Sequence, residues 1–149
     1  MNNRIFNEQF IQWVGDTYHW QDAIRKSTQP LLEQNRIMNN YIDSMIENVM
    51  ELGPYILIAP NVALPHSRPE SGVKEAGVSL TVFETPVQFK KKQEYHAQIF
   101  ICLAATTSET HLSLLKTISS WIENKDLMTT VASADGKNEL LQLFAPYYF

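Results

Sequence analysis

Residues 53–70 read GPYILIAPNVALPHSRPE, so a run of apolar residues leads into a proline-rich loop that contains a single histidine. The apolar part, Tyr55–Ala59, predicts a buried β-strand. Prolines on both sides of His66 restrict the loop, because proline fixes its own φ and limits the residue before it. A rigid loop of this kind favours a histidine that is held still and presented to another molecule.

Two helices are predicted before this stretch. The first covers roughly residues 20–34, and Pro30 is expected to end or kink it. The second carries apolar side chains at helical spacing, which are Met38, Tyr41, Ile42, Met45, Ile46, Val49 and Met50. Gly53 is the expected C-terminal cap of this helix, and Pro54 follows it.

Strands and helices are both predicted in the remaining chain. Residues 77–83 alternate, with Val78, Leu80 and Val82 set against Ser79, Thr81 and Phe83. Residues 97–105 are almost continuously apolar, which suits a central strand covered on both faces. A helix is expected from Ser108, its candidate N-cap, with an inner face of Leu112, Leu115, Ile118 and Ile122. Short helices over 125–134 and 136–143 complete a layered α/β sandwich, in which helices flank a mixed sheet.

The composition argues against several classes of protein. The net charge is −4 and Lys90–Lys92 is the only basic run, so no nucleic-acid surface is expected and these lysines are assigned to a solvated turn. No apolar run reaches membrane-spanning length, and the first residues lack the apolar core of a secretory signal. We therefore expect a cytoplasmic protein without membrane insertion, with one domain over residues 1–149.

Metal and nucleotide sites are not expected either. The chain has no Cys/His cluster with metal-ligand spacing and no glycine-rich phosphate loop. The single cysteine excludes an internal disulfide, and Cys102 lies within an apolar run, where inert packing is expected.

Two histidines carry the strongest chemical signal. His66 lies in the proline-rich loop, and His111 lies in the first turn of the helix expected from Ser108. A helix N-terminus attracts anions, above all phosphate. Neutral imidazole offers a lone pair near neutral pH, so we hypothesise that His66 is a nucleophile for a phosphoryl group and that His111 contacts or orients it. The alternatives are a solvated loop histidine at position 66 and a structural residue at position 111.

Other candidates are weaker. Contacts to phosphate or to a partner are expected, as secondary candidates, from Arg68, Ser67, Ser108 and Thr110. An exposed ion pair between Arg68 and Glu70 is an equal alternative for the arginine. Ser67 should point away from His66, because neighbouring side chains on an extended loop diverge, and His19 and His96 are assigned to solvent.

The segment Gly53–Glu70, together with Gly72-Val73, resembles the phosphorylation-site signature of enzyme IIA in the mannitol/fructose class of the bacterial phosphoenolpyruvate-dependent sugar phosphotransferase system. Its form is most similar to the ascorbate-type branch. The resemblance continues over nearly the whole chain beyond the first dozen or so residues, through residues 20–24, 41–45, 86–89, 99–105 and 109–112.

The resemblance implies a sandwich with a five-stranded mixed sheet and no metal or small cofactor. It implies that His66 is the phosphorylated histidine and that His111 contacts the phosphoryl group. Phosphate would come from the phosphohistidine of HPr and pass to the cysteine of an enzyme IIB. A membrane enzyme IIC would then move an ascorbate-like or related sugar. The alternative is a phosphorylation-dependent regulatory protein built on the same module.

The chain also departs from the family pattern. Asn61 stands where many relatives have glycine, and residues 45–50 lack the active-site arginine of some mannitol-type relatives. Either Arg68 or backbone amides replace that arginine, or this branch works without it. An apolar rim around His66 is expected from Ala59, Ala63, Leu64 and Pro65. Residues 147–149, YYF, either close the core or form the contact of a homodimer.

Overall fold

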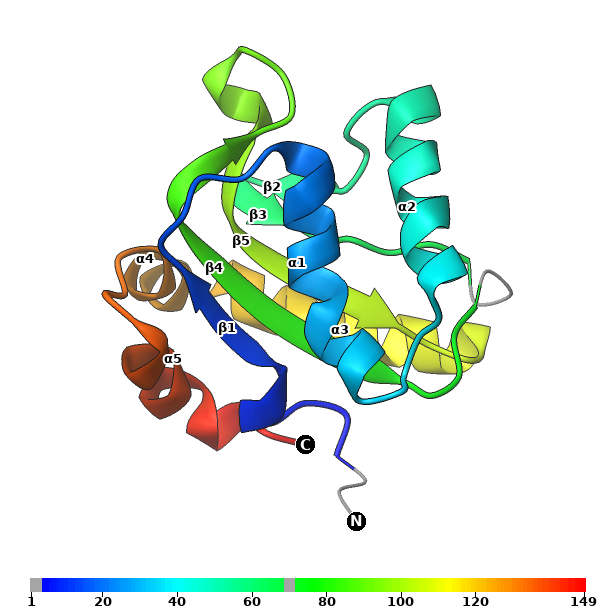
Figure 1. The fold of residues 1–149 in the computed structure, drawn as a ribbon. Coiled ribbons are helices and arrows are strands. Elements are labelled where there is room, and N and C mark those ends of the chain that lie inside the picture. The colour runs from blue at the N-terminus through cyan, green and yellow to red at the C-terminus, as the bar shows by residue number, and fades with distance from the viewer. Residues whose placement is uncertain (1–3, 69–71) are drawn as a thin grey trace.

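The computed structural model describes residues 4–68 and 72–149. Its strands are β1 (Ile11–Val14), β2 (Leu57–Ala59), β3 (Asn61–Ala63), β4 (Gly77–Gln88) and β5 (His96–Ala104). Its α-helices are α1 (Trp20–Glu33), α2 (Asn39–Leu52), α3 (Ser108–Glu123), α4 (Lys125–Ala132) and α5 (Lys137–Phe144) (Figure 1). None of the helices in these described residues is long and apolar enough to cross a membrane.

The strands form a five-stranded sheet in the order β1-β4-β5-β3-β2. Strand β1 is parallel to β4 and β3 is parallel to β5, whereas β4–β5 and β2–β3 are antiparallel. Helix α1 lies in front of the sheet and α3 behind it in Figure 1. The prediction of a mixed sheet flanked by helices is therefore confirmed.

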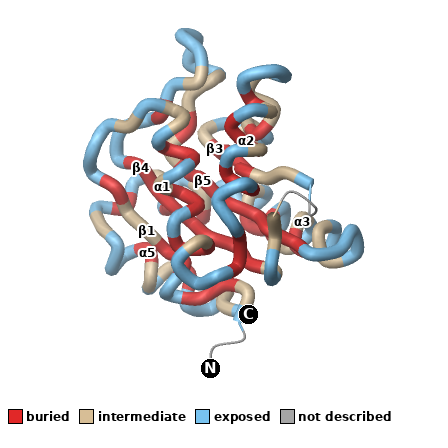
Figure 2. The backbone as a smooth tube through the Cα atoms, turned by 45° about the vertical axis from the view of Figure 1, so that its right-hand side comes forward, coloured by how far each residue is buried: buried red, intermediate tan, exposed pale blue. Residues whose placement is uncertain are grey.

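The core lies along the two central strands, where Figure 2 shows the longest buried stretches. The predicted central strand over 97–105 is β5, and it is buried almost throughout. The alternation in 77–83 does not separate a buried face from an exposed one, because Ser79 and Thr81 are buried as well. The Ser79 hydroxyl donates to the Ser27 carbonyl of α1, and Thr81 Oγ1 accepts from the Gln12 amide, so both polar groups are satisfied.

Helix α1 covers almost all of the predicted 20–34 and continues past Pro30 to Glu33, so of the two expected effects of this proline, an end or a kink, the end is wrong. Proline has no N–H to donate to the carbonyl four residues earlier, which is that of Lys26. The side-chain amide of Gln12 on β1 donates to this carbonyl at 2.8 Å instead. A neighbouring strand thus replaces the hydrogen bond that proline removes.

Helix α2 buries a narrower face than the sequence predicts. Met38 and Met50 were both assigned to it, but they are 47% and 65% exposed. Met38 precedes the helix in an extended conformation, and Met50 lies beyond the buried stripe at 100° per residue. Gly53 is the predicted cap: its φ is +83°, and its N–H donates to the Val49 carbonyl.

The buried strand predicted over Tyr55–Ala59 is shorter and lies at the edge of the sheet. Only Leu57–Ala59 is a strand, and Ile58 is 46% exposed because β2 pairs with β3 alone. Asn61 begins β3 with a φ of +66°, a value that asparagine tolerates better than most residues. Its side chain also exchanges two hydrogen bonds with Gln98 of β5, which fixes the turn between β2 and β3.

The C-terminal residues pack onto the core. The Phe149 carbonyl accepts from the backbone N–H groups of Ile5 and Phe6, and the Tyr148 ring packs edge-on against Phe6. Tyr147 contacts the Trp121 ring. Closing the core, one of the two roles expected for residues 147–149, is therefore the one seen within this chain.

Candidate functional site

His66 lies in the loop that follows β3, and backbone contacts hold the residues around it. The Leu64 N–H donates to the Ile56 carbonyl at 2.7 Å, and the Leu103 N–H of β5 donates to the Pro65 carbonyl at 3.1 Å. Pro65 is buried, whereas His66 is half-buried. The second proline of the predicted bracket, Pro69, lies outside the described residues.

The His66 imidazole is oriented by its own backbone. Its Nδ1 lies 2.5 Å from the Leu64 carbonyl oxygen. A carbonyl only accepts hydrogen bonds, so Nδ1 carries the proton in this contact, and in the neutral imidazole the lone pair is then on Nε2. The other nitrogen is therefore the nucleophilic one.

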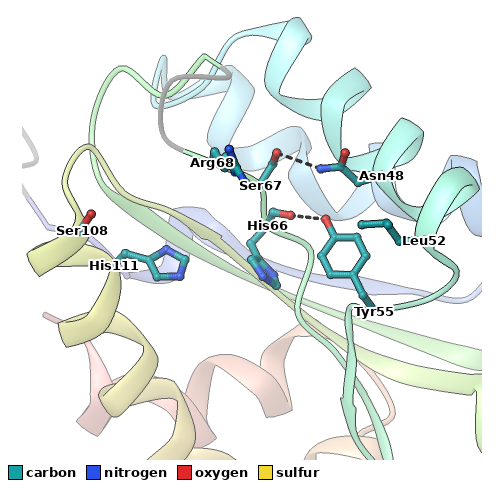
Figure 3. A pocket seen from close by; sticks show the side chains of 8 residues that line it. All are labelled: Asn48, Leu52, Tyr55, His66, Ser67, Arg68, Ser108 and His111. Carbon is teal, nitrogen blue, oxygen red and sulfur yellow. Dashed lines mark hydrogen bonds between the residues drawn. The ribbon is translucent and has the colours of Figure 1, made fainter.

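The His66 ring lies in a pocket of about 340 Å³ at the C-terminal ends of β3 and β5. Figure 3 shows its side chains, which are Asn48, Leu52, Tyr55, His66, Ser67, Arg68, Ser108 and His111. The pocket thus joins the loop after β3, the end of α2 and the start of α3.

His111 faces His66 across this pocket. The two ring centroids are 6.0 Å apart, with the rings tilted by 50°. Burial, and then the neighbouring His66, lower the pKa of His111 from its usual range. His111 is therefore a neutral imidazole near pH 7, able both to donate and to accept a hydrogen bond.

The N-cap of α3 is Thr107, so the assignment of Ser108 as the cap is wrong by one residue. Thr107 has extended backbone angles, and its Oγ1 accepts from the Thr110 N–H at 3.1 Å. Thr106, Thr107 and Ser108 can each cap a helix, so the sequence alone does not decide which of them is the N-cap. Ser108 is instead the first helical residue and lines the pocket.

The secondary candidates divide between the pocket and its surroundings. Arg68 is exposed and lines the pocket, and within residues 4–68 and 72–149 its guanidinium has no hydrogen bond or ion pair. Its suggested partner Glu70 lies outside the described residues. The Thr110 hydroxyl bonds to Thr107, and Thr110 is not among the described residues that line the pocket.

Ser67 points away from His66, as expected, and toward α2 (Figure 3). Its hydroxyl lies 2.8 Å from the Ser44 hydroxyl and accepts from the Asn48 amide at 3.3 Å. Asn48 was not predicted as a site residue. Asn48 lies in residues 45–50, the segment that lacks the active-site arginine of some mannitol-type relatives. That departure is the one sequence signal that points to this segment.

The predicted apolar rim around His66 is wrong. Ala63, Leu64 and Pro65 are buried beneath the loop, and Ala59 is half-buried in the edge strand. The exposed apolar residue of the pocket is Leu52, at 72%.

The predicted inner face of helix α3 is confirmed at Ile118 and in part at Leu115 and Ile122, which pack against the core, but it is wrong at Leu112. Leu112, beside His111, is 55% exposed rather than buried. The buried residues of the helix are Leu114, Ile118 and Trp121.

The remaining candidate residues have structural surroundings. His19 is exposed and its Nδ1 accepts from the Gln21 N–H at the start of α1. His96 is half-buried rather than solvent-facing, and its Nε2 lies 3.1 Å from the Lys90 carbonyl. Lys90–Lys92 are exposed, as predicted for this turn.

Cys102 is fully buried, and burial raises the pKa of its thiol to about 12, which agrees with inert packing.

Metal-ligating side chains do not gather in the described residues: no group of three or more His, Cys, Asp or Glu side chains lies close enough to hold an ion. The pocket instead brings together two imidazoles, a guanidinium and the first turn of α3, beside the neutral polar side chains of Asn48, Tyr55 and Ser67. This set suits a small anion that is bound or transferred.

Comparison with known proteins gives a consistent result. Residues 4–146 match the family model described as "Phosphoenolpyruvate-dependent sugar phosphotransferase system, EIIA 2". The mannitol-specific cryptic phosphotransferase enzyme IIA component of Escherichia coli K12 is 31% identical over 94% of this chain and 95% of its own. The ascorbate-specific PTS system EIIA component of the same strain is 30% identical over 96% and 94%. These identities are nearly equal, so they show the family rather than the sugar-specific branch.

Solved structures agree with this result. The solution structure of the cryptic mannitol enzyme IIA from E. coli has a TM-score of 0.88 and 30% identity, covering 95% of this chain and 96% of that one. The enzyme IIA of a complex with phosphorylated enzyme IIB for mannitol, also from E. coli, has a TM-score of 0.78 at 20% identity, covering 95% and 97%. This second likeness concerns the fold alone.

Proposed function

This chain belongs to the EIIA 2 family of the phosphoenolpyruvate-dependent sugar phosphotransferase system, and on that premise we propose that it carries a phosphoryl group on His66. The donor is the phosphohistidine of HPr, and the acceptor is the cysteine of an enzyme IIB that serves a membrane enzyme IIC. The observation that carries the proposal is the His66 ring itself: Nδ1 is held by the Leu64 carbonyl, so that Nε2 is free and faces a pocket shared with His111.

In the loading step, the Nε2 lone pair of His66 attacks the phosphorus of the donor phosphohistidine. The new N–P bond forms while the donor's N–P bond breaks, and that electron pair returns to the donor imidazole. The proton on Nδ1 stays in place, and the Leu64 carbonyl stabilises the charge that develops on the ring. In the unloading step, a cysteine thiolate attacks the same phosphorus and the electron pair returns to Nε2.

The rest of the pocket supplies charge stabilisation. His111 is neutral and donates an N–H to a phosphoryl oxygen. The first N–H groups of α3 lie at the positive end of the helix dipole, and since the Thr110 N–H is taken by the Thr107 cap, those of Ser108 and Glu109 are the ones left for a phosphoryl oxygen. The Arg68 side chain adds a full positive charge at the rim, which supports it as the substitute for the arginine absent from 45–50.

The partners follow from the same reasoning. The enzyme IIB partner is supported by the solved mannitol complex of enzymes IIA and IIB, which shares this fold. Leu52 offers an exposed apolar contact beside the pocket, and the net charge of −4 favours a basic partner face. A regulatory protein would carry the same phosphate on His66 but would not pass it on.

Labelling tests the proposal. The protein is incubated with phosphoenolpyruvate, enzyme I and HPr, and its intact mass is measured for the wild type and for His66→Ala. We expect one acid-labile phosphate in the wild type and none in the variant, followed by loss of the label when an enzyme IIB is added. A label retained by His66→Ala contradicts the assignment of His66, and a label that no enzyme IIB removes favours the regulator.

A further inference from the structure

The peptide that joins His66 to Ser67 is hydrogen-bonded at both edges by tyrosine hydroxyls. Tyr55 donates to the His66 carbonyl at 2.6 Å, a contact that Figure 3 shows directly. On the other edge, the Ser67 N–H donates to the Tyr41 hydroxyl at 3.1 Å. The carbonyl and the N–H belong to one planar unit, so the two hydroxyls together restrict its rotation.

The Tyr41 hydroxyl replaces a backbone hydrogen bond that would join the loop to β5 if the parallel pairing of β3 and β5 continued. In the register of β3 and β5, Ala63 lies opposite Phe100, so His66 lies opposite Leu103 when the pairing is extended. In parallel pairing the N–H and carbonyl of Leu103 would bond to Pro65 and to Ser67. The first bond is present, but the Leu103 carbonyl accepts from the Tyr41 hydroxyl at 2.7 Å instead.

This insertion separates the loop from the sheet at the residue that follows His66. The Tyr41 side chain comes from α2 and is only 1% exposed, so its hydroxyl is held by the core. Tyr55 is half-buried in the pocket wall, where its ring packs edge-on against the His66 ring with centroids 5.5 Å apart. Tyr41 therefore holds the peptide from the core, and Tyr55 holds it from the pocket wall.

We propose that Tyr41 and Tyr55 are positioning residues that jointly fix the His66–Ser67 peptide and, through it, the direction in which Nε2 faces. Without these two hydrogen bonds the loop backbone at His66 could shift as a whole, and the ring could then move away from the Leu64 carbonyl, the contact that keeps the proton on Nδ1. The consequence for the rate of phosphate loading rests on the proposed function of His66. The consequence for the proton does not, because it concerns the unphosphorylated protein.

The test uses Tyr41→Phe, Tyr55→Phe and the double variant, each of which keeps the ring and removes the hydroxyl. Ser79→Ala is the matched control: it also loses one buried hydroxyl, which donates to α1 rather than to the loop. The first measurement is ¹⁵N NMR of the His66 imidazole without any phosphoryl donor. We expect mostly the Nδ1–H tautomer in the wild type and in Ser79→Ala, and a raised Nε2–H fraction in both tyrosine variants.

The second measurement is the rate of phosphate loading from phospho-HPr. Losing one hydrogen bond should slow loading by about five- to tenfold in each single variant. The double variant should be hardly slower than the slower single variant, because releasing either edge already frees the peptide. Ser79→Ala should load at the wild-type rate.

The outcomes separate this proposal from the proposed function. Wild-type tautomer fractions in both tyrosine variants overturn the positioning role, and so do losses that multiply in the double variant. If Tyr41→Phe does not fold, the half-buried Tyr55→Phe decides the matter through the same tautomer measurement. A wild-type protein that takes no phosphate on His66 refutes the proposed function, while the tautomer result still decides the roles of the two tyrosines.

Discussion

At the level of single residues, the pocket contains two imidazoles whose surroundings differ. His66 has one nitrogen tied to the Leu64 carbonyl, whereas the pKa of His111 is lowered by burial and by the nearby His66. In the proposed transfer, the first arrangement supplies the nucleophile and the second a neutral hydrogen-bond donor beside it. The proposal therefore assigns the two histidines different roles.

Replacing His111 with alanine should slow phosphoryl transfer without preventing folding. His111 is half-buried and near a helix start, so little core packing is lost. A hydrogen bond to a charged phosphoryl oxygen is worth enough to predict a fall of about ten- to hundredfold in the loading rate. Rapid-quench kinetics with phospho-HPr measure this rate, and circular dichroism checks the fold; unchanged kinetics in a folded variant would remove His111 from the mechanism.

The lowered pKa of His111 also predicts how stability varies with pH. The unfolded chain binds a proton on this imidazole more readily than the folded chain does, so stability rises with pH through this group. The contribution is complete above the unfolded pKa of about 6.5 and is lost as the pH falls from there through the lowered folded value. In urea unfolding at pH 7.5 and pH 5.5, the wild type should lose more stability than His111→Gln, and an equal loss would contradict the shift.

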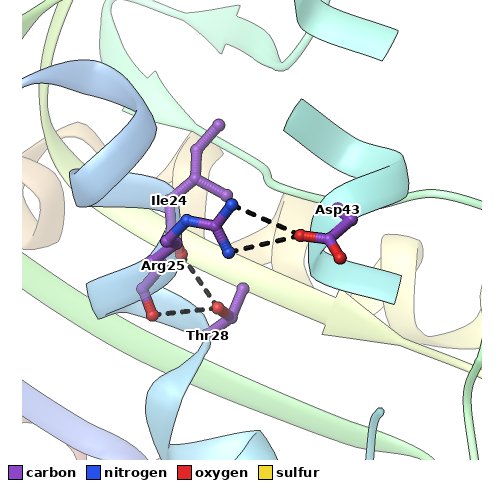
Figure 4. Close-up of polar contacts among 4 residues, drawn as sticks. All are labelled: Ile24, Arg25, Thr28 and Asp43. Carbon is purple, nitrogen blue, oxygen red and sulfur yellow. Dashed lines mark hydrogen bonds and ion pairs between the residues drawn. The ribbon is translucent and has the colours of Figure 1, made fainter. Parts of the chain in front are cut away.

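At the scale of the element, helix α2 brings Tyr41 and Asn48 to the loop that carries His66. The ion pair between Arg25 of α1 and Asp43 of α2, shown in Figure 4, spans 3.3 Å but is about half exposed on both sides. Exposed pairs of this kind contribute about 0–1 kcal/mol. The position of α2 therefore depends mainly on its buried face and on the Tyr41 hydroxyl.

The hydrogen bond from Gln12 of β1 to helix α1 can be tested by mutation. Gln12 of β1 donates to the Lys26 carbonyl that Pro30 leaves without its helical partner. Gln12→Ala should cost about 1–2 kcal/mol of unfolding free energy, because that carbonyl becomes unsatisfied. In a Pro30→Ala background the helix regains its own N–H donor, so the same change should cost clearly less. Urea unfolding of the four proteins measures the difference, and equal costs in both backgrounds would refute this explanation.

The helices, including the short α4 and α5, were predictable from the sequence, whereas the shortest strands were not. Helices α1 and α2 and strand β5 have enough residues for their spacing or apolar content to be read, and Gly53 marks one boundary clearly. Strands β1 and β3 have four and three residues, too few for a periodic pattern, and both were missed. Pro30 misled because the hydrogen bond that replaces the lost one comes from a strand far away in the sequence.

At the scale of the whole molecule, the site exists because two parallel strands end at the same edge. Strands β3 and β5 are neighbours, and the His66 loop follows the first while α3 follows the second. The loop, the helix start and the family resemblance all pointed to His66 and His111, which the structure places opposite each other. The contacts of Tyr41, Asn48 and Tyr55 with the loop were not predictable, because they arise only when α2 and the segment before β2 pack beside it.

If the chain relays phosphate through Nε2 of His66, the phosphate must be found on that atom in the loaded protein. Protein with ¹⁵N-labelled histidine is loaded by phosphoenolpyruvate, enzyme I and HPr, and the ³¹P–¹⁵N coupling is observed by NMR. We expect one phosphate, bonded to Nε2 of His66, while Nδ1 keeps its proton against the Leu64 carbonyl. A phosphate on Nδ1, or on any residue other than His66, would contradict it.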